Sequence, residues 1–301
     1  FLCLFVLYLH DKRKLKANLY QDTNYTKQIL KISFPIAITS YIRSGLSTLK
    51  QILIPLQLEK SGMSCEYAIS RYGMIHGMVM PLILFPCTFI NSFSGLLIPE
   101  FSYMQAKKSY RKMEIAFEKI FKVSFLFSFF ILGVFWCFSQ ELSSMIYQEP
   151  EIAKFVKILA PLIVLMYIDS IVDSILKGLD KQVIVMGINI VDLIVSISFI
   201  YFLLPSSGVI GYIIVLYISE ILNGIVSLWF LWKETHFCFD IANWLIEPLL
   251  SIFLSSFVLS ILPPVSSSSF IGVCIEILLF GVCYFLFLCL FKAVQKEDMK
   301  I

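Results

Sequence analysis

Two basic residues stand in the middle of an apolar stretch, residues 28–57. Arg43 and Lys50 are seven residues apart, which places them two turns apart on one face of a helix. A cation near the membrane centre is costly and normally faces a bundle interior or a water-filled cavity. The stretch is long enough and apolar enough to span a membrane. We therefore expect a helix that lines a cavity with this face and meets lipid with its back.

Polar side chains accompany the two cations on this predicted helix. A planar guanidinium binds a phosphate or carboxylate through two parallel hydrogen bonds, whereas an ammonium acts as a point charge. Neighbouring hydroxyl and amide groups can hydrogen-bond to a sugar or a phosphate. The candidate substrate-binding residues are therefore Arg43, Lys50, Ser40, Ser44, Ser47 and Gln51.

Carboxylates recur in later apolar stretches, at the depth expected for the membrane interior. Asp169 and Asp173 are four residues apart, and Asp173 is expected to pair locally with Lys177. Asp192 and Glu220 stand near the middle of the next two apolar stretches. Buried carboxylates either neutralise buried cations or mark ion and proton pathways. The candidates for ion coupling or for counter-ions to Arg43 and Lys50 are Asp169, Asp192 and Glu220, and both roles stay open.

The composition predicts an all-α integral membrane protein. Of the 301 residues, 58% are hydrophobic and only 15% are charged, too few charges for a soluble domain of this size. We assign the many aromatic residues to lipid-facing bulk and interfacial anchoring. The sequence contains no P-loop, no nucleophile elbow and no zinc-ligand spacing. We therefore predict no enzyme, no cofactor, no metal site and no nucleic-acid partner.

Apolar stretches indicate eight complete spans after a partial one. No basic segment precedes the apolar residues 1–9, so we expect them to end a helix that begins upstream, and the chain to be the second half of a longer protein. Residues 10–28 form a basic cytoplasmic linker. Pro81 and Pro86 are expected to kink the second complete span. The complete spans are predicted at 29–56, 72–98, 120–139, 153–175, 182–204, 210–232, 243–262 and 269–291.

Basic residues are concentrated on alternate connectors between these spans. Most of the 24 lysines and arginines lie on the first, third, fifth and seventh connectors and on the tail. Connectors rich in lysine and arginine stay on the cytoplasmic side of a membrane. We therefore expect a multi-pass protein of the cell membrane, with the first linker and the C-terminus in the cytoplasm.

Four segments carry a family resemblance: FPIAITSYIRSGLSTLKQILIP (34–55), RYGMIHGMVMPLILFP (71–86), SGLLIPEFS (94–102) and LKGLDKQ (176–182). They resemble the stage V sporulation protein B branch of the oligosaccharide exporters, in the flippase superfamily that includes MurJ and the MATE exporters. The resemblance implies two six-helix bundles around a central cavity. Residues 29–232 would form the second bundle, and residues 233–301 two additional helices with a cytoplasmic tail.

The same resemblance implies a flippase or exporter that moves a lipid-linked oligosaccharide or peptidoglycan precursor by alternating access. Its partners would be a lipid-linked diphosphate sugar, membrane lipids and the N-terminal bundle of the same chain. Arg43 matches by position an arginine that faces the cavity in the MurJ relatives. A MATE-type multidrug or cation antiporter is one alternative; it predicts a net acidic cavity, against which Arg43 and Lys50 argue. A non-transporting membrane assembly protein is another, and the short connectors argue against it.

Overall fold

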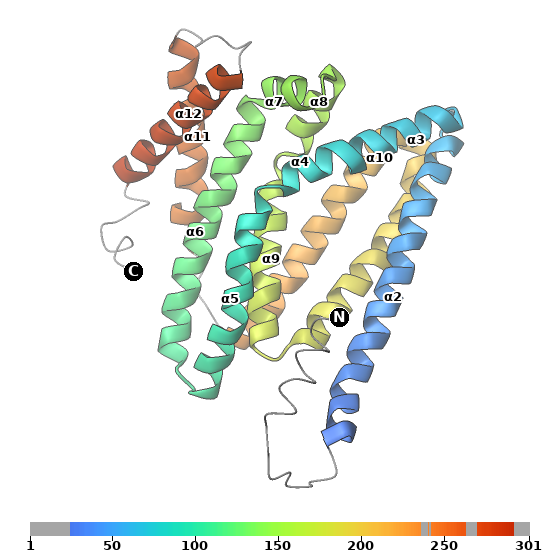
Figure 1. The fold of residues 1–301 in the computed structure, drawn as a ribbon, viewed down its shortest axis with the longest axis vertical. Helices are drawn as coiled ribbons and strands as arrows, with labels where there is room; N and C mark the ends of the chain where they lie inside the picture. Colours follow the sequence, from blue (N-terminus) through green and yellow to red (C-terminus); the bar gives the residue numbers. More distant parts are fainter. Residues whose placement is uncertain (1–24, 236–239, 241, 263–269, 292–301) are drawn as a thin grey trace, which may run out of the picture.

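A computed structural model describes residues 25–235, 240, 242–262 and 270–291, and all of its regular elements over these ranges are helices (Figure 1). The expectations for residues 1–9, for most of the 10–28 linker and for the tail fall outside the described residues. The elements are α2 (Tyr25–Lys60), α3 (Cys65–Met74), the π-helix η1 (Ile75–Val79), α4 (Met80–Leu84), α5 (Cys87–Ala106), α6 (Tyr110–Cys137), α7 (Ser139–Ile146), α8 (Pro150–Leu159), α9 (Leu162–Gly178), α10 (Gln182–Thr235), the π-helix η2 (Ala242–Ile246), α11 (Glu247–Ile261) and α12 (Phe270–Leu290).

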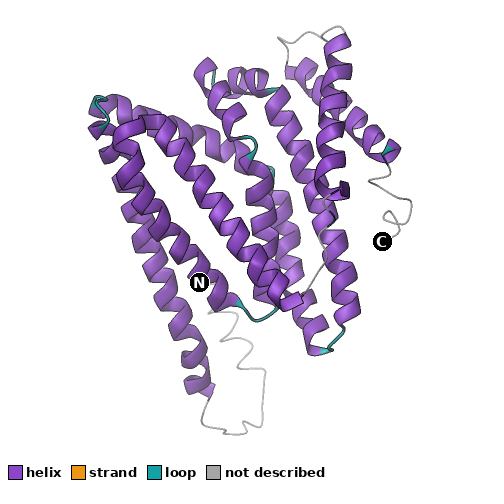
Figure 2. Ribbon diagram, turned by 180° about the vertical axis from the view of Figure 1, so that it is seen from behind, coloured by secondary structure: helices purple, strands orange, loops and turns teal. Residues whose placement is uncertain are grey.

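The long helices stand side by side in a bundle, as both ribbon views show (Figures 1 and 2). Helix α2 packs on α10, α10 on α9, and α9 on both α5 and α6. The last two helices, α11 and α12, pack on each other and on α6, at the side of the bundle away from α2 (Figure 1). Helix α2, which carries the two cations, therefore packs directly on the acid-bearing helix α10. Helices α11 and α12 take no part in this contact.

Within the described residues, four helical segments are long and apolar enough to cross a membrane: α6, α10, residues 243–261 and α12. Two bent pairs meet the same criterion jointly, α3 to α4 with α5 and α8 with α9. The chain is therefore a multi-pass helical membrane protein. Helix α2 is not among these segments, which are chosen by length and composition alone, and its span stays a prediction. Its 36 residues are long enough, but they carry the central cations and polar face.

Helix α10 contains the two spans predicted at 182–204 and 210–232, joined at Gly208. Gly208 has φ 56° and ψ −133°, a backbone conformation that suits glycine. Ser196 and Ser219 lie at nearly equal distances along the chain from Gly208, and their hydroxyl oxygens are 3.0 Å apart. The two halves therefore run antiparallel, with the chain reversing at the predicted turn.

Several helices extend beyond the predicted spans. Helix α6 begins at Tyr110 rather than near residue 120, because Met113 and Phe117 continue its buried face into the basic connector at helical spacing. The connector predicted between the spans 120–139 and 153–175 contains most of the short helix α7, which packs against α8. Charged residues in the first segment and polar residues in the second made them resemble connectors, although one face of each is buried.

Part of the aromatic content forms the core, which corrects its assignment to the lipid-facing surface. Phe117, Phe121, Phe125 and Phe129 are spaced four residues apart on α6, and each is at most 5% exposed. Trp244 stacks on two of them, with ring centroids 5.9 Å from Phe121 and 6.1 Å from Phe125. Such stacking adds to the stabilisation from burial alone and fixes α6 against the start of the last helical pair.

Two spans bend sharply next to a proline. The bend near Pro86, between α4 and α5, is 59° and confirms the predicted kink there. A second bend, of 54°, separates α8 from α9 at Pro161 and was not predicted. A proline has no amide hydrogen, so carbonyl groups in the preceding turn lose their usual donors. Near Pro81 the helix is irregular in another way: the π-helix η1 directly precedes α4, whose second residue is Pro81.

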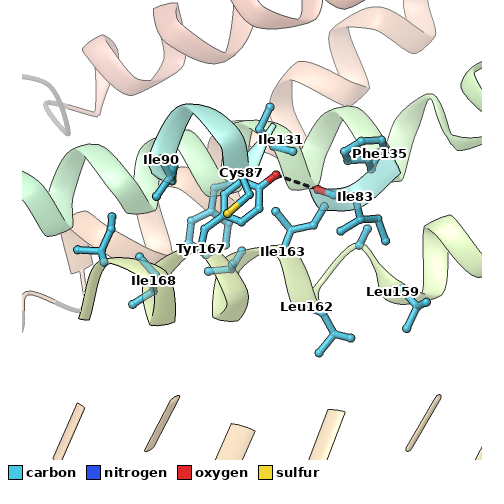
Figure 3. Packing of buried hydrophobic residues seen from close by; sticks show 14 of the residues in the cluster. Ile83, Cys87, Ile90, Ile131, Phe135, Leu159, Leu162, Ile163, Tyr167 and Ile168 are labelled. Carbon is cyan, nitrogen blue, oxygen red and sulfur yellow. Dashed lines mark hydrogen bonds between the residues drawn. The ribbon is translucent and has the colours of Figure 1, made fainter. Parts of the chain in front are cut away.

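Tyrosine hydroxyls satisfy carbonyl groups near all three irregularities. Tyr167 donates to the Ile83 carbonyl at 2.9 Å, beside the Pro86 bend (Figure 3). Tyr217 donates to the Ile158 carbonyl at 2.5 Å, beside the Pro161 bend. Tyr147 donates to the carbonyl of Met78 in η1, at 3.0 Å. Within a membrane no water replaces a missing donor, so these contacts allow the helices to bend there.

We predict that Tyr167→Phe lowers the free energy of unfolding by about 1–3 kcal/mol, because a buried carbonyl loses its partner. Thermal unfolding of the purified protein in detergent measures the change. Tyr110→Phe is the matched control, because Tyr110 is 70% exposed. Equal melting temperatures for the two variants would show that the hydroxyl of Tyr167 is not needed at the bend.

Candidate functional site

Polar residues from four helices meet around a cavity of about 360 Å³. Helix α2 contributes one wall, α4 and α5 a second, α9 a third, and both halves of α10 the fourth. The lining residues are Arg43, Ser47, Leu84, Cys87, Asn91, Met166, Asp169, Ser170, Asn189, Asp192, Leu193, Glu220 and Asn223. Most of them carry charged, hydroxyl or amide groups, which sets this cavity apart from the apolar core around it.

Helix α2 presents Arg43 and Ser47 to this cavity, one turn apart. The side chain of Arg43 is exposed, and it forms no ion pair with any residue that the structure describes. Its guanidinium is therefore available to an anion that enters the cavity.

Asp169 and Asp192 are held by amide and hydroxyl donors rather than by cations. Asn223 Nδ2 donates to Asp169 Oδ2 at 2.8 Å, while Asp169 Oδ1 is buried without a hydrogen-bond partner among the described residues. Ser219 Oγ donates to Asp192 Oδ1 at 2.6 Å, and Ser196 Oγ donates to Ser219 Oγ at 3.0 Å. These hydrogen bonds link α9 to the second half of α10, and the two halves of α10 to each other. They fix both carboxylates at the cavity wall.

Five of the nine predicted site residues line the cavity: Arg43, Ser47, Asp169, Asp192 and Glu220. Lys50 lies outside the lining, although it is partly buried and interacts electrostatically with Asp192 and Glu220. The other three, Ser40, Ser44 and Gln51, are exposed on α2 and are not part of the lining. A helix face that reads as continuous in the sequence thus meets the cavity over only about one turn.

Asp173 lies one turn beyond Asp169 and takes no part in the lining. Its Oδ2 atom is 3.4 Å from Lys177 Nζ, which confirms the predicted local pair. The two acids of this helix therefore differ in environment. One faces the cavity, and the other is paired with a cation near the end of α9.

Asn91 and Ser170 also line the cavity and were not proposed from the sequence. Ser170 Oγ donates to Asn91 Oδ1 at 2.5 Å, joining α9 to α5. Asn189 and Asn223 are the other amides in the lining. For Asn91 the available signal was an amide in a span without charged residues, but such a residue also suits helix packing.

The described lining carries one guanidinium and three carboxylates, so it is net acidic when all are ionised. The expectation that Arg43 and Lys50 would prevent a net acidic cavity was therefore wrong for this part of it. The spacing of Arg43 and Lys50 along α2 indicated that the cations share a face. The carboxylates come from α9 and α10, and only the tertiary structure brings them together. In the part of the chain that the structure describes, no cluster of histidine, cysteine and carboxylate residues could hold a metal ion.

Residues 75–202 match the MatE family model. This stretch runs from η1 through the first half of α10 and supplies most of the cavity wall. Stage V sporulation protein B of Bacillus subtilis (strain 168) is 24% identical over 217 residues. The resemblance read from the sequence is confirmed.

The aligned region covers 70% of this chain and 42% of the sporulation protein, so the chain spans about two fifths of that relative's length. Both findings agree with the predicted all-α membrane fold. Neither match is to an enzyme, in line with the sequence prediction. Helix α2 lies outside the residues matched by the MatE model, so that match does not cover Arg43 of the lining or the nearby Lys50.

Proposed function

We propose that the chain forms the second bundle of a membrane transporter, with the polar cavity as its half of the substrate site. The observation that carries the proposal is the meeting of Arg43, Asp169, Asp192 and Glu220 at one cavity in an otherwise apolar helical bundle. Ionisable groups at membrane depth are costly and mark substrate or ion pathways. The MatE match supports transport by rocking of one bundle against the other.

The substrate that we propose is a lipid-linked diphosphate sugar, supported by Arg43 and by the resemblance to the sporulation branch. The guanidinium would hold the diphosphate, and Ser47 with the cavity amides would hydrogen-bond to the sugar. An anion is repelled by three ionised carboxylates, so these must be neutralised when it binds. We therefore assign proton or cation binding to Asp169, Asp192 and Glu220, which would couple transport to an ion gradient. The N-terminal bundle and membrane lipids would be the partners, with the C-terminus in the cytoplasm.

The net acidic lining favours a second candidate, an antiporter that exports organic cations. In that case Asp192 and Glu220 would bind the exported cation, and Arg43 would only set the charge balance. The two candidates make opposite predictions for a change of charge at position 43. A diphosphate needs the guanidinium, whereas an organic cation binds better without it.

Cysteine accessibility tests the cavity itself. In a protein freed of its other cysteines, we expect a charged, membrane-impermeant thiol reagent to label positions 43 and 47. Position 49, on the exposed apolar side of α2, should stay unlabelled. Protection of 43 and 47 by a polyprenyl diphosphate sugar would support the flippase, and protection by an organic cation such as tetraphenylphosphonium would support the antiporter. Absence of labelling at both positions would contradict a hydrated site.

A further inference from the structure

A second cavity, of about 490 Å³, lies between α5 and α6 and has an almost wholly apolar wall. Phe89, Phe93 and Leu97 line it from α5, and Val123 and Phe127 line it from α6. The ring of Phe89 lies against that of Phe127, with centroids 6.5 Å apart. These residues form an open groove along two neighbouring helices, which we call the α5–α6 groove.

The α5–α6 groove faces away from the polar cavity. Cys87 and Asn91 of α5 line the polar cavity, whereas Phe89 and Phe93 line the groove. Two residues turn a helix by roughly 200°, so the two pairs point to opposite sides of α5. Phe93 is 70% exposed and Val123 is 66% exposed. In a multi-pass membrane protein, such an exposed apolar face looks toward lipid.

Two lysines, Lys119 and Lys122, stand at one end of this groove, and no carboxylate belongs to its lining. Lys119 is exposed and forms no ion pair with any described residue. This end lies toward the turn between α5 and α6, at the lower edge of Figure 1. The turn and the start of α6 carry four further basic residues, Lys107, Lys108, Arg111 and Lys112. Such basic ends lie at the cytoplasmic leaflet, which holds anionic lipids.

We propose that the α5–α6 groove binds one acyl chain of an anionic phospholipid, whose phosphate is held by Lys119. The apolar wall accounts for the chain, and Lys119, which forms no ion pair with a described residue, accounts for the choice of head group. A lipid that merely coated the surface would show no preference for charge. A soluble phosphate would gain nothing from the aromatic wall. The proposal needs the membrane location alone and is independent of what the polar cavity transports.

Native mass spectrometry of the purified protein tests this site by counting lipids bound from micelles. The probes are phosphatidylglycerol and phosphatidylcholine with identical acyl chains. We expect Lys119→Gln to weaken phosphatidylglycerol binding about fivefold, the effect of one lysine near an anionic lipid surface. Phosphatidylcholine binding should weaken less, because the choline cation offsets the charge of its phosphate. Lys112→Gln is the matched control, because Lys112 is an exposed lysine on the same helix outside the groove.

A second variant, Val123→Trp, fills the groove without changing its charge. It should displace both lipids, whereas added glycerol phosphate should displace neither. An unchanged phosphatidylglycerol affinity in Lys119→Gln would overturn the role of the lysine. An unchanged affinity in Val123→Trp would overturn the groove as the binding site for the chain. Competition by glycerol phosphate would show a simple phosphate site instead. Thermal unfolding of each variant shows whether it is folded before its lipids are counted.

Discussion

Arg43→Glu is expected to abolish binding of a lipid-linked diphosphate sugar. Arg43 lines the polar cavity and is free of ion pairs with the residues that the structure describes. Loss of one partner from a close charge pair costs about 2–5 kcal/mol, and reversal of the charge adds repulsion. We therefore expect affinity for a polyprenyl diphosphate sugar to fall at least about a hundredfold. Binding to the protein in lipid nanodiscs measures this, with transport in proteoliposomes as a second readout.

Lys31→Glu is the matched control, because it reverses an exposed charge on the same helix outside the cavity lining. Arg43→Lys keeps the charge but loses the planar fork, so an intermediate affinity is expected. Affinity for tetraphenylphosphonium that rises in Arg43→Glu would favour the cation antiporter. Diphosphate binding that survives in Arg43→Glu would remove Arg43 from the site.

Gly178→Leu is expected to separate α9 from α5 and to destabilise the protein by about 3 kcal/mol or more, because it forces atoms into a packed contact. A Cβ atom at Gly178 would lie 2.9 Å from the carbonyl oxygen of Ile98 and 2.9 Å from the Cβ of Phe101. Neither neighbour can move easily, because one is backbone and the other is fully buried. Thermal and denaturant unfolding in detergent measure the loss. Even Gly178→Ala should cost about 1–3 kcal/mol for the same reason.

Gly187→Ala is the control for Gly178→Ala, since a Cβ at position 187 meets nothing within 4 Å. It should be neutral or slightly stabilising, because alanine favours a helix more than glycine does. A hydrogen bond also holds α5 close to α9 at this end, because Ser102 Oγ donates to the Gly178 carbonyl at 2.7 Å. Equal stability of the two alanine variants would show that α5 and α9 can move apart freely there.

The sequence was sufficient to locate the helices and several of the ionisable residues in the site. Membrane spans are predictable because each must be apolar over a fixed length. Charges inside such spans must face the protein interior, and this led directly to Arg43, Asp169, Asp192 and Glu220. The prediction was less accurate for helix ends. Residues 110–119 and 139–146 are helical, but the charges of the first and the polar residues of the second made them resemble connectors.

Periodicity along one helix determined which residues share a face, as it did for Arg43 and Lys50. Only the tertiary structure decided how far along that face the cavity reaches, so that Ser47 lines it and Ser40 does not. The tertiary structure also decided the net charge of the cavity lining, because the carboxylates come from α9 and from both halves of α10. Contacts between side chains such as Asn223 and Asp169 depend on how the helices pack. Packing is set by shape and depth across the bundle, and no spacing within a single helix contains that information.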